Sequence, residues 1–400
     1  MADRIVLNTI SYHGHGAIEN IVPELTARGY KKAFVCSDPD LIKFGVTGKI
    51  TALLDAASFP YAVYSEIKPN PTIQNVQDGV AAFKAAEADC IVTIGGGSSM
   101  DTAKAIGIII NNPEFADVRS LEGVAPTKKH AVFTIAVPTT AGTAAEVTIN
   151  YVITDVEKKR KFVCVDTNDI PEIAVVDPDM MSSMPKGLTA ATGMDALTHA
   201  IEAYIGRSTT RQTRSAAVEA IQLIFDNLQN AYNNGNDKTA RHHMLRASYL
   251  AGTAFTKSYV GYVHAVAHSL GGCYGIPHGL ANSVLLPVIL EAYGTAAHKK
   301  LARLARLTGI SDSDLDAVAA GEFIRHIRSM NLSMNIPETL DGIRNEDIPK
   351  LACYADKEAN PLYPVPVLWG PSKLEQMYHL VQEVNENDRN RNSEHPGKAA

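Results

Sequence analysis

The stretch "DCIVTIGGGSSMDTAKAIGII", residues 89–109, decides the fold class because it joins a strand-like run directly to a helix-like run. Three consecutive glycines at 95–97 separate the two runs, and glycine lets a backbone approach a ligand closely. We expect Ser98 or Ser99 to cap the helix, so that its free N–H groups face the glycines. Such a helix start is an anion site that suits a pyrophosphate.

A glycine-rich turn is by itself a weak indication of a ligand, because many such turns only pack. The stretch also departs from the dinucleotide fingerprint GxGxxG, since Met100 follows "GGGSS", and it has no Walker lysine. Two further features favour a nucleotide. The segment "VPTTAGTAAEVT" (137–148) follows a strand-like run and offers threonine hydroxyls, and Asp38 closes the strand-like run "KAFVCSD".

The chain on both sides of this stretch alternates strands and helices up to about residue 184. Apolar residues at helical spacing occupy 70–88 and 99–112. The alternation predicts an α/β domain over 1–184, with a mainly parallel sheet that binds ligands beyond the carboxyl ends of its strands. Brief runs rich in Val and Ile predict strands at 32–38, 61–67, 89–97, 130–140 and 171–180.

From residue 185 the strand signals stop and helical periodicity takes over, which predicts an all-helical second domain over 185–384. The remaining segment 385–400, "NENDRNRNSEHPGKAA", has too little apolar surface to repay ordering, and we expect it to be disordered. Helical spacing of apolar residues is clearest over 185–205, 213–232, 239–255 and 298–309.

The composition is that of a globular protein, and it excludes several classes of partner. A formal net charge of -6 offers no electrostatic footprint for nucleic acid or an anionic membrane surface. No apolar run approaches the roughly 18–20 residues that a membrane span needs. The 5 cysteines are scattered and form no CxxC pair, which favours a reducing, cytoplasmic location and argues against a structural zinc site.

Histidines gather in one place although only 13 occur in 400 residues. His264 and His268 are four apart, so a helix would place both on one face. A turn containing Gly and Pro then leads to His278. Upstream, Asp195 and His199 form a second pair with the same spacing on an otherwise apolar stretch, where a lone buried carboxylate would be costly.

One aspartate and three or four histidines indicate an oxygen and nitrogen metal site. The alternative is that these side chains only fill a core and hydrogen-bond there, which is the usual fate of a single buried histidine. The spacing of the residues leaves open which of the histidines bind the metal.

Together these motifs resemble the iron-containing (group III) alcohol dehydrogenases over roughly residues 3–383. The segments that carry the resemblance are "GGGSSMDTAKAIG", "PTTAGTAAEVT", "ATGMDALTHAIEAY" and "HAVAHSLGGCYGIPHG". The resemblance implies a dehydroquinate synthase-like fold, with NAD bound by the N-terminal α/β domain and a metal bound by the all-α C-terminal domain. Chemistry would take place in the cleft between them.

The resemblance also implies roles for single residues. The metal ligands would be Asp195, His199, His264 and His278. His268 would lie beside them as a catalytic residue near nicotinamide and substrate, and Asn150 and Phe255 match positions of a substrate pocket. The residues expected to bind the cofactor are Asp38, Asn70, Gly96, Gly97, Ser98, Asp101, Thr139, Thr140, Thr143 and Lys161. Asp38 would face the adenosine ribose, which favours NAD over NADP.

The reaction implied is reversible hydride transfer between NAD(H) and a short-chain alcohol or 1,2-diol, with Fe²⁺ as the metal and Zn²⁺ as a substitute. We expect a homodimer with a small-molecule substrate. One segment, "ADKEANPLYPVPVLWG" (355–370), looks like other branches of the family, so a general short-chain or 1,3-propanediol-type dehydrogenase is the first alternative. A metal-dependent lyase of the dehydroquinate synthase type is another alternative, and a metallohydrolase or a nucleotide sensor is more distant.

Overall fold

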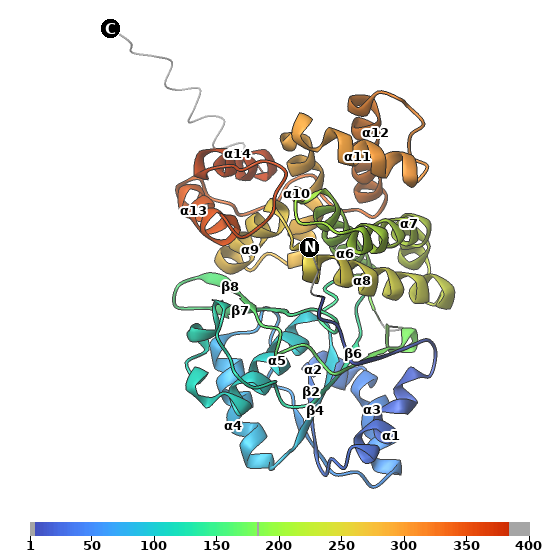
Figure 1. Cartoon of the computed structure of the whole chain (residues 1–400), viewed down its shortest axis with the longest axis vertical. Helices are drawn as coiled ribbons and strands as arrows, with labels where there is room; N and C mark the ends of the chain where they lie inside the picture. The colour runs from blue at the N-terminus through green and yellow to red at the C-terminus, as the bar shows by residue number, and fades with distance from the viewer. Residues whose placement is uncertain (1–4, 182–183, 384–400) are drawn as a thin grey trace.

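The computed structural model of the chain describes residues 5–181 and 184–383. Figure 1 shows two halves: one combines strands with helices, and the other consists of helices packed on one another. The polar tail that we expect to be disordered, 385–400, lies outside the described residues.

A six-stranded sheet in the order β1-β9-β6-β4-β2-β3 forms the centre of the first half. All neighbouring strands pair in parallel, which confirms the predicted α/β architecture. Four of the strands are buried along their whole length, so their sequences are continuous apolar runs. The strands are β1 (Ile10–His13), β2 (Ala33–Ser37), β3 (Tyr61–Tyr64), β4 (Cys90–Gly95), β6 (Thr134–Pro138) and β9 (Ile173–Val176).

Sequence analysis missed two strand features. The short edge strand β1 and an antiparallel hairpin formed by β7 (Asn150–Asp155) and β8 (Arg160–Val165) were not predicted. The hairpin joins β5 (Gly123–Val124) in a separate three-stranded sheet. Burial alternates from residue to residue over most of both hairpin strands, and their apolar runs, 151–153 and 162–165, are short and flanked by polar residues, so they give a weaker signal.

Helices cover both faces of the six-stranded sheet. Successive residues of β2 point to opposite faces: Phe34 and Cys36 pack with α4 and α5, whereas Ala33 and Val35 pack with α1 and α3. Figure 1 shows these two pairs of helices on either side of the sheet. The helices of this half are α1 (Ile21–Ala27), α2 (Pro39–Lys43), α3 (Val46–Ala56), α4 (Ile73–Ala86) and α5 (Gly97–Asn111). Short 3-10 turns lie at η1 (Ala17–Asn20), η2 (Pro113–Phe115), η3 (Val118–Leu121) and η4 (Pro178–Met181).

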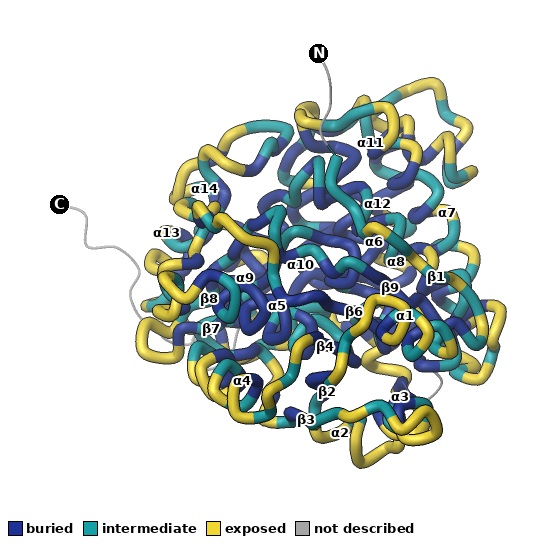
Figure 2. Tube along the Cα trace, turned by 60° about the horizontal axis from the view of Figure 1, so that its bottom comes forward, coloured by how far each residue is buried: buried dark blue, intermediate teal, exposed yellow. Residues whose placement is uncertain are grey.

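The second half is helical, as predicted. Two of its helices, α6 and α10, are buried along most of their length, and Figure 2 shows that buried stretches run through the middle of the molecule. Its helices are α6 (Lys186–Ile205), α7 (Arg211–Asn233), α8 (Lys238–Ser258), α9 (Tyr262–Tyr274), α10 (His278–Tyr293), α11 (Thr295–Leu307), α12 (Asp316–Ser333), α13 (Ile348–Ala359) and α14 (Pro371–Val381), with a 3-10 turn η5 (Asn345–Asp347).

The change from sheet to helices occurs between Val176, where β9 ends, and Lys186, where α6 begins. The domain boundary at residue 184 stays a prediction. In the part of the chain that the structure describes, no single helix is long and apolar enough to cross a membrane, although α10 and α11, bent by 118°, pass that test as a pair.

Candidate active site

The turn that sequence analysis predicts to bind phosphate is the glycine loop, residues 95–97. Helix α5 begins at Gly97, so neither Ser98 nor Ser99 caps it, and that prediction was wrong. Gly96 takes the N-cap position with extended backbone, and no side chain accepts a hydrogen bond from the first turn. Glycine can occupy the N-cap position, so the helix begins at Gly97, before the two serines. The N–H groups of the first turn thus remain available to an anion.

Two predicted phosphate-binding segments meet at this loop. A Cβ atom on Gly96 would lie 3.1 Å from Thr140 Oγ1, and one on Gly97 would lie 3.0 Å from Thr143 Cγ2. Both threonines are half-buried. They reach the loop because β4 and β6 are parallel neighbours and their carboxyl ends share one edge of the sheet. A larger residue in the loop would fill the space that the threonine hydroxyls face.

Other expected cofactor residues lie at or near the same edge. The backbone N–H of Thr139 donates to Gly95 O at 3.0 Å. Asp38 follows β2, the neighbour of β4, and its carboxylate accepts from Leu41 N at 3.0 Å as the N-cap of α2. Asn70 precedes α4 in a loop whose next residue bonds to the β7–β8 hairpin.

Asp101 and Lys161 join the glycine-loop helix to the hairpin. Asp101 on α5 accepts from Val152 N at 3.0 Å, and Lys161 Nζ would lie 3.0 Å from a Cβ atom on Gly271 of α9. Burial raises the pKa of Asp101 to about 7 and lowers the pKa of Lys161 to about 8, and each side chain opposes the shift of the other. The lysine therefore reaches from the α/β half to the helix that carries the histidines.

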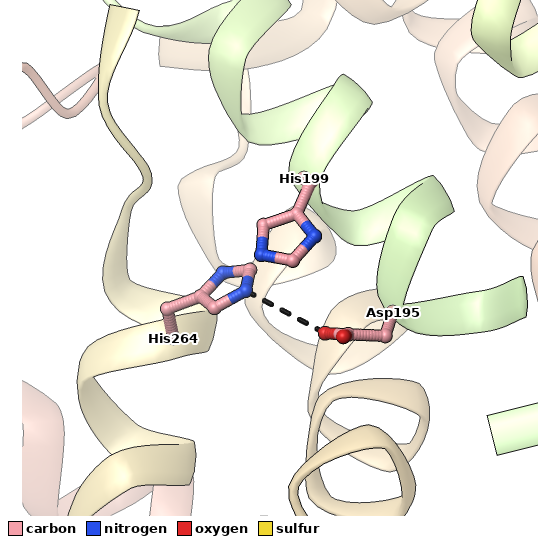
Figure 3. A group of neighbouring side chains, drawn as sticks. All are labelled: Asp195, His199 and His264. Carbon is pink, nitrogen blue, oxygen red and sulfur yellow. Dashed lines mark ion pairs between the residues drawn. The ribbon is translucent and has the colours of Figure 1, made fainter. Parts of the chain in front are cut away.

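The two i,i+4 pairs of the sequence meet in space. Helix α6 presents Asp195 and His199, and α9 presents His264, as Figure 3 shows. Each of the three offers a ligand atom within 4.8 Å of the other two, and His264 Nε2 lies 3.7 Å from Asp195 Oδ1. All three side chains are buried.

His278 begins α10 and approaches the same carboxylate. Its Nε2 lies 3.5 Å from Asp195 Oδ1, and the Asn282 side chain contacts both residues, at 2.7 Å from Asp195 and 3.1 Å from His278. His278 is outside the tighter group of three. We refer to Asp195, His199, His264 and His278 as the metal-ligand cluster.

The donor chemistry of this cluster fits a divalent metal. Three ring nitrogens of the cluster are buried and have no hydrogen-bond partner among the described residues: His199 Nδ1, His264 Nε2 and His278 Nδ1. Burial lowers the pKa of His199 to about 3 and the pKa of His278 well below its usual value, so both rings are neutral and can offer a lone pair. Burial would raise the pKa of Asp195, but the neighbouring imidazoles hold it well below its usual range.

Glu202 orients one of these rings, and sequence analysis did not identify it. Its Oε2 lies 2.6 Å from His264 Nδ1, and its two oxygens also accept from Gly261 N and Val263 N at the start of α9. Burial favours neutral His264, but the neighbouring carboxylates of Asp195 and Glu202 raise its pKa to about 9. The carboxylate thus keeps Nε2 directed at the cluster, as outer-shell carboxylates do in many metal sites. A buried acid on α6, three residues after His199, was the available signal.

His268 lies beside the cluster but is held by a different acid. Its Nδ1 lies 2.7 Å from Glu358 Oε1, and the Tyr363 hydroxyl donates to the same oxygen at 2.8 Å. Its ring stacks on that of His278 at 5.0 Å between centroids. Glu358 and Tyr363 belong to the divergent segment 355–370, so that segment contributes to the site.

Of the two expected substrate residues, Phe255 contacts His199, and Asn150 lies on a strand that bonds to the residue after Phe255. The ring of Phe255 stacks on that of His199 at 4.2 Å and 13°. Ile149, next to Asn150, donates its N–H to the side chain of Thr256, next to Phe255, at 3.2 Å. The Asn150 side-chain oxygen is buried and accepts no hydrogen bond within 5–181 and 184–383.

A second group with metal-ligand geometry consists of His15, Asp177 and Asp179 near the surface. Its carboxylates already have partners: Asp177 accepts from two backbone N–H groups, and Asp179 pairs with His15 and Lys238. The buried metal-ligand cluster, with its unpartnered nitrogens, is the better metal site.

Comparisons with known proteins agree with this geometry. Residues 8–178 match the family model for iron-containing alcohol dehydrogenase, and residues 189–378 match the model for the C-terminal part of the Fe-containing alcohol dehydrogenase family. The two matched ranges correspond to the sheet-containing half and the helical half.

Relatives match over nearly the whole chain. Lactaldehyde reductase of Escherichia coli K12 is 46% identical over 355 residues, which is 88% of this chain and 92% of the relative. The 1,3-propanediol dehydrogenase of Klebsiella pneumoniae is 40% identical, covering 90% of this chain and 94% of the relative. The crystal structure of a 1,3-propanediol oxidoreductase superposes with a TM-score of 0.89 and 37% identity, over 95% of this chain and 99% of that one. The chain therefore belongs to the iron-containing alcohol dehydrogenase family and is an NAD-dependent oxidoreductase.

Proposed function

We propose that the enzyme interconverts a short 1,2-diol and its 2-hydroxyaldehyde, with 1,2-propanediol and lactaldehyde as the pair. The observation that carries this proposal is the buried oxygen of Asn150, which has no partner among the described residues, on a strand that bonds through Ile149 to Thr256, the residue after Phe255. A second substrate hydroxyl would supply the missing donor, because an unmet buried acceptor is costly. Phe255 would limit the length of the substrate. The 46% identity to lactaldehyde reductase supports the same choice.

The metal-ligand cluster would hold the metal, which we propose to be Fe²⁺. Zn²⁺ generally binds such ligands more tightly, so purified protein can carry it instead. When bound, the metal supplies Lewis acidity at the substrate oxygen, and NAD accepts or returns the hydride. Restoration of activity by Zn²⁺ but never by Fe²⁺, under anaerobic conditions, would overturn the choice of iron.

His268 would carry the proton of the alcohol. His268 Nδ1 would donate its hydrogen to Glu358, so Nε2 would be the atom that accepts the proton of the alcohol. Tyr363 donates to the same Glu358 oxygen and holds the carboxylate in place. The stack of His268 on His278 keeps the imidazole next to the metal-ligand cluster.

The glycine loop and its threonines would bind the pyrophosphate of NAD, while Asp38 would accept from the adenosine ribose. A carboxylate there binds a 2′-hydroxyl and repels a 2′-phosphate. Asp38→Asn tests this role, because asparagine caps a helix as well as aspartate and only the charge is lost. Activity with NADP relative to NAD should rise in this variant, and an unchanged ratio would remove Asp38 from the role.

Two properties of the whole molecule are also proposed. β1 pairs only with β9 in the described sheet, so one of its edges is open, and we propose a homodimer that light scattering can test. All five cysteines are free, which suits a cytoplasmic enzyme and can be checked by cell fractionation.

The decisive experiment compares 1,2-propanediol with 1-propanol as substrates of the iron-loaded enzyme, with NADH formation as the signal. The diol should be better by about ten-fold, which is roughly the worth of one net hydrogen bond. Asn150→Ala should erase the advantage and leave 1-propanol nearly unchanged, so 1-propanol serves as the internal control.

A general short-chain or 1,3-propanediol-type dehydrogenase is the second candidate. It is favoured by the 355–370 segment and by the relative from Klebsiella pneumoniae. If 1-propanol or 1,3-propanediol is the better substrate of the unmodified enzyme, this candidate replaces the first one.

A further inference from the structure

A cavity of about 240 Å³ opens away from the metal-ligand cluster, between the β7–β8 turn, the end of α9 and the start of α13. We call it the cation pocket. The lining side chains used below are those of Lys159, Cys273, Tyr274, Arg344, Asp347 and Lys350. Its volume is below the roughly 300–1,000 Å³ of pockets for drug-sized ligands, so it suits a small ligand.

Positive charge in the pocket exceeds negative charge. Arg344 is paired with Asp347 through Nε at 2.9 Å and Nη2 at 2.6 Å, and the Tyr274 hydroxyl donates to the same carboxylate at 2.7 Å. Lys159 and Lys350 form no ion pair with any described carboxylate. Arg344 also pairs with Glu346, which does not line the pocket, and Lys350 lies over the ring of Tyr354, 5.6 Å from its centroid. Lys159 and Lys350 are therefore the two cations of the pocket without a carboxylate partner in the part of the chain that the structure describes.

The thiol of Cys273 lines the same pocket as the three cations. Burial and the carboxylate of Asp347 raise the pKa of this thiol, and the charges of Arg344, Lys350 and Lys159 each oppose that rise. The side chains of Lys159, Arg344 and Lys350 are exposed, so an ion from solvent can reach them.

The walls of the cation pocket continue into the active site. Lys350, Tyr354 and Glu358 are spaced four apart on α13, so the face that lines the pocket also carries the partner of His268. Helix α9 carries His268 and ends at Tyr274, which lines the pocket. The β7–β8 hairpin carries Lys159, which also lines the pocket, and Lys161, which lies against α9. Figure 1 and Figure 2 both show α9, α13 and β8 side by side.

We propose that the cation pocket binds a compact dianion, inorganic phosphate or a phosphate monoester, as an effector of the enzyme. The anion would bridge Lys159 on the hairpin and Lys350 on α13, and it would thereby fix both elements against α9. Helix α13 carries Glu358, the partner of His268, and the hairpin carries Lys161, which reaches α9. Anion binding in the pocket should therefore favour the catalytically active conformation of the enzyme.

The first test measures binding of inorganic phosphate to the metal-loaded, full-length enzyme by calorimetry. Saturating NAD is present throughout, because the glycine loop is itself an anion site, and chloride keeps the ionic strength constant. The double variant Lys159→Gln/Lys350→Gln should bind phosphate about ten-fold more weakly or worse. The control Lys84→Gln/Lys128→Gln removes two exposed lysines elsewhere and should bind like the unmodified enzyme. Equal binding by the pocket variant overturns the site.

The second test uses the thiol in the pocket. Phosphate should slow alkylation of Cys273 by iodoacetamide, measured by mass spectrometry of its peptide. Cys353, exposed on α13 and outside the pocket lining, is the control in the same molecule and should react at an unchanged rate. Equal slowing at both thiols, or none at Cys273, contradicts binding in the pocket.

The third test concerns the effector role. Saturating phosphate should raise kcat by about five-fold, the lower end of typical allosteric coupling, and the pocket variant should lose this response. Phosphate that binds and leaves kcat unchanged overturns the effector role. The binding and thiol measurements need no turnover, so they remain informative if the proposed diol substrate is wrong.

Discussion

The metal-ligand cluster and the glycine loop are the two proposed sites for charged groups, and they are built in opposite ways. The cluster presents side-chain nitrogens and oxygens that point inward from α6, α9 and α10. The loop has no side chains, which leaves its backbone N–H groups open beside the side chains of two threonines. The cluster should therefore fail when atoms are taken away, and the loop should fail when atoms are added.

Removing a ligand from the cluster should have the largest effect. Asp195→Ala or His264→Ala should lose most of the metal and nearly all activity while the fold is retained, because each leaves a neighbour unpaired in a buried site. Elemental analysis and circular dichroism measure the two outcomes. His326→Ala, which removes a half-buried helix histidine outside the cluster, is the control and should keep its metal. Full metal occupancy in both cluster variants would disprove the site.

His268 separates metal binding from proton transfer within the same region. His268→Ala should keep the metal and lower kcat by about 10²–10⁴-fold, the usual contribution of a general acid or base. Metal content and steady-state rates are measured on the same preparation. Loss of metal together with activity would mean that His268 is a ligand and that its hydrogen bond with Glu358 has another purpose.

Changing the orienting carboxylate should have an intermediate effect. Glu202→Gln keeps the size of the side chain but weakens its hold on His264 Nδ1, so metal affinity should fall by about 10–100-fold. Competition with a chelator gives this affinity. Glu219→Gln changes an exposed acid on α7 and should leave the affinity unchanged. If Glu202→Gln binds the metal as tightly as the unmodified enzyme does, Glu202 only caps the start of α9 and does not support metal binding.

Adding one carbon to the glycine loop tests the other side of the comparison. The new Cβ of Gly97→Ala would lie 3.0 Å from Thr143 Cγ2, so NAD affinity should fall by about ten-fold while metal content stays the same. Fluorescence titration with NADH measures the affinity. Gly48→Ala places its Cβ in open space on α3 and is the matched control. Unchanged NADH binding by Gly97→Ala would show that the loop tolerates a side chain.

The smallest effect concerns pH and Lys161, which lies between the two regions. Its pKa is lowered to about 8 by burial, so the cation is present below pH 8 and is lost as the pH rises above it. NAD carries negative charge, and its affinity should therefore weaken by a few-fold from pH 7 to pH 9. Lys161→Gln should bind NAD more weakly at pH 7 and show a flatter profile. The same slope in the variant would assign the pH dependence to another group.

Local patterns predicted much of the fold and of the site. The strands that are buried on both faces gave a clear apolar signal, whereas the edge strand β1 and the partly exposed hairpin gave a weaker one. The spacing of Asp195 with His199 predicted that they share a helix face, since the helical repeat alone determines this. The prediction that a serine caps α5 was wrong because glycine can also occupy the N-cap position. Gly96 does so, and the helix begins before the serines.

The sequence by itself determined the two halves, the glycine loop, and the residue types that could bind a metal, because these depend on neighbours along the chain. Only the tertiary structure decided which acid serves which histidine. Glu202 and His264 are 62 residues apart, and Glu358 and His268 are 90 residues apart. No local period relates such residues. They meet because α9 packs against α10 and α13, and α6 packs against α10. A buried carboxylate needs a polar partner, and this packing determines which partner lies beside it.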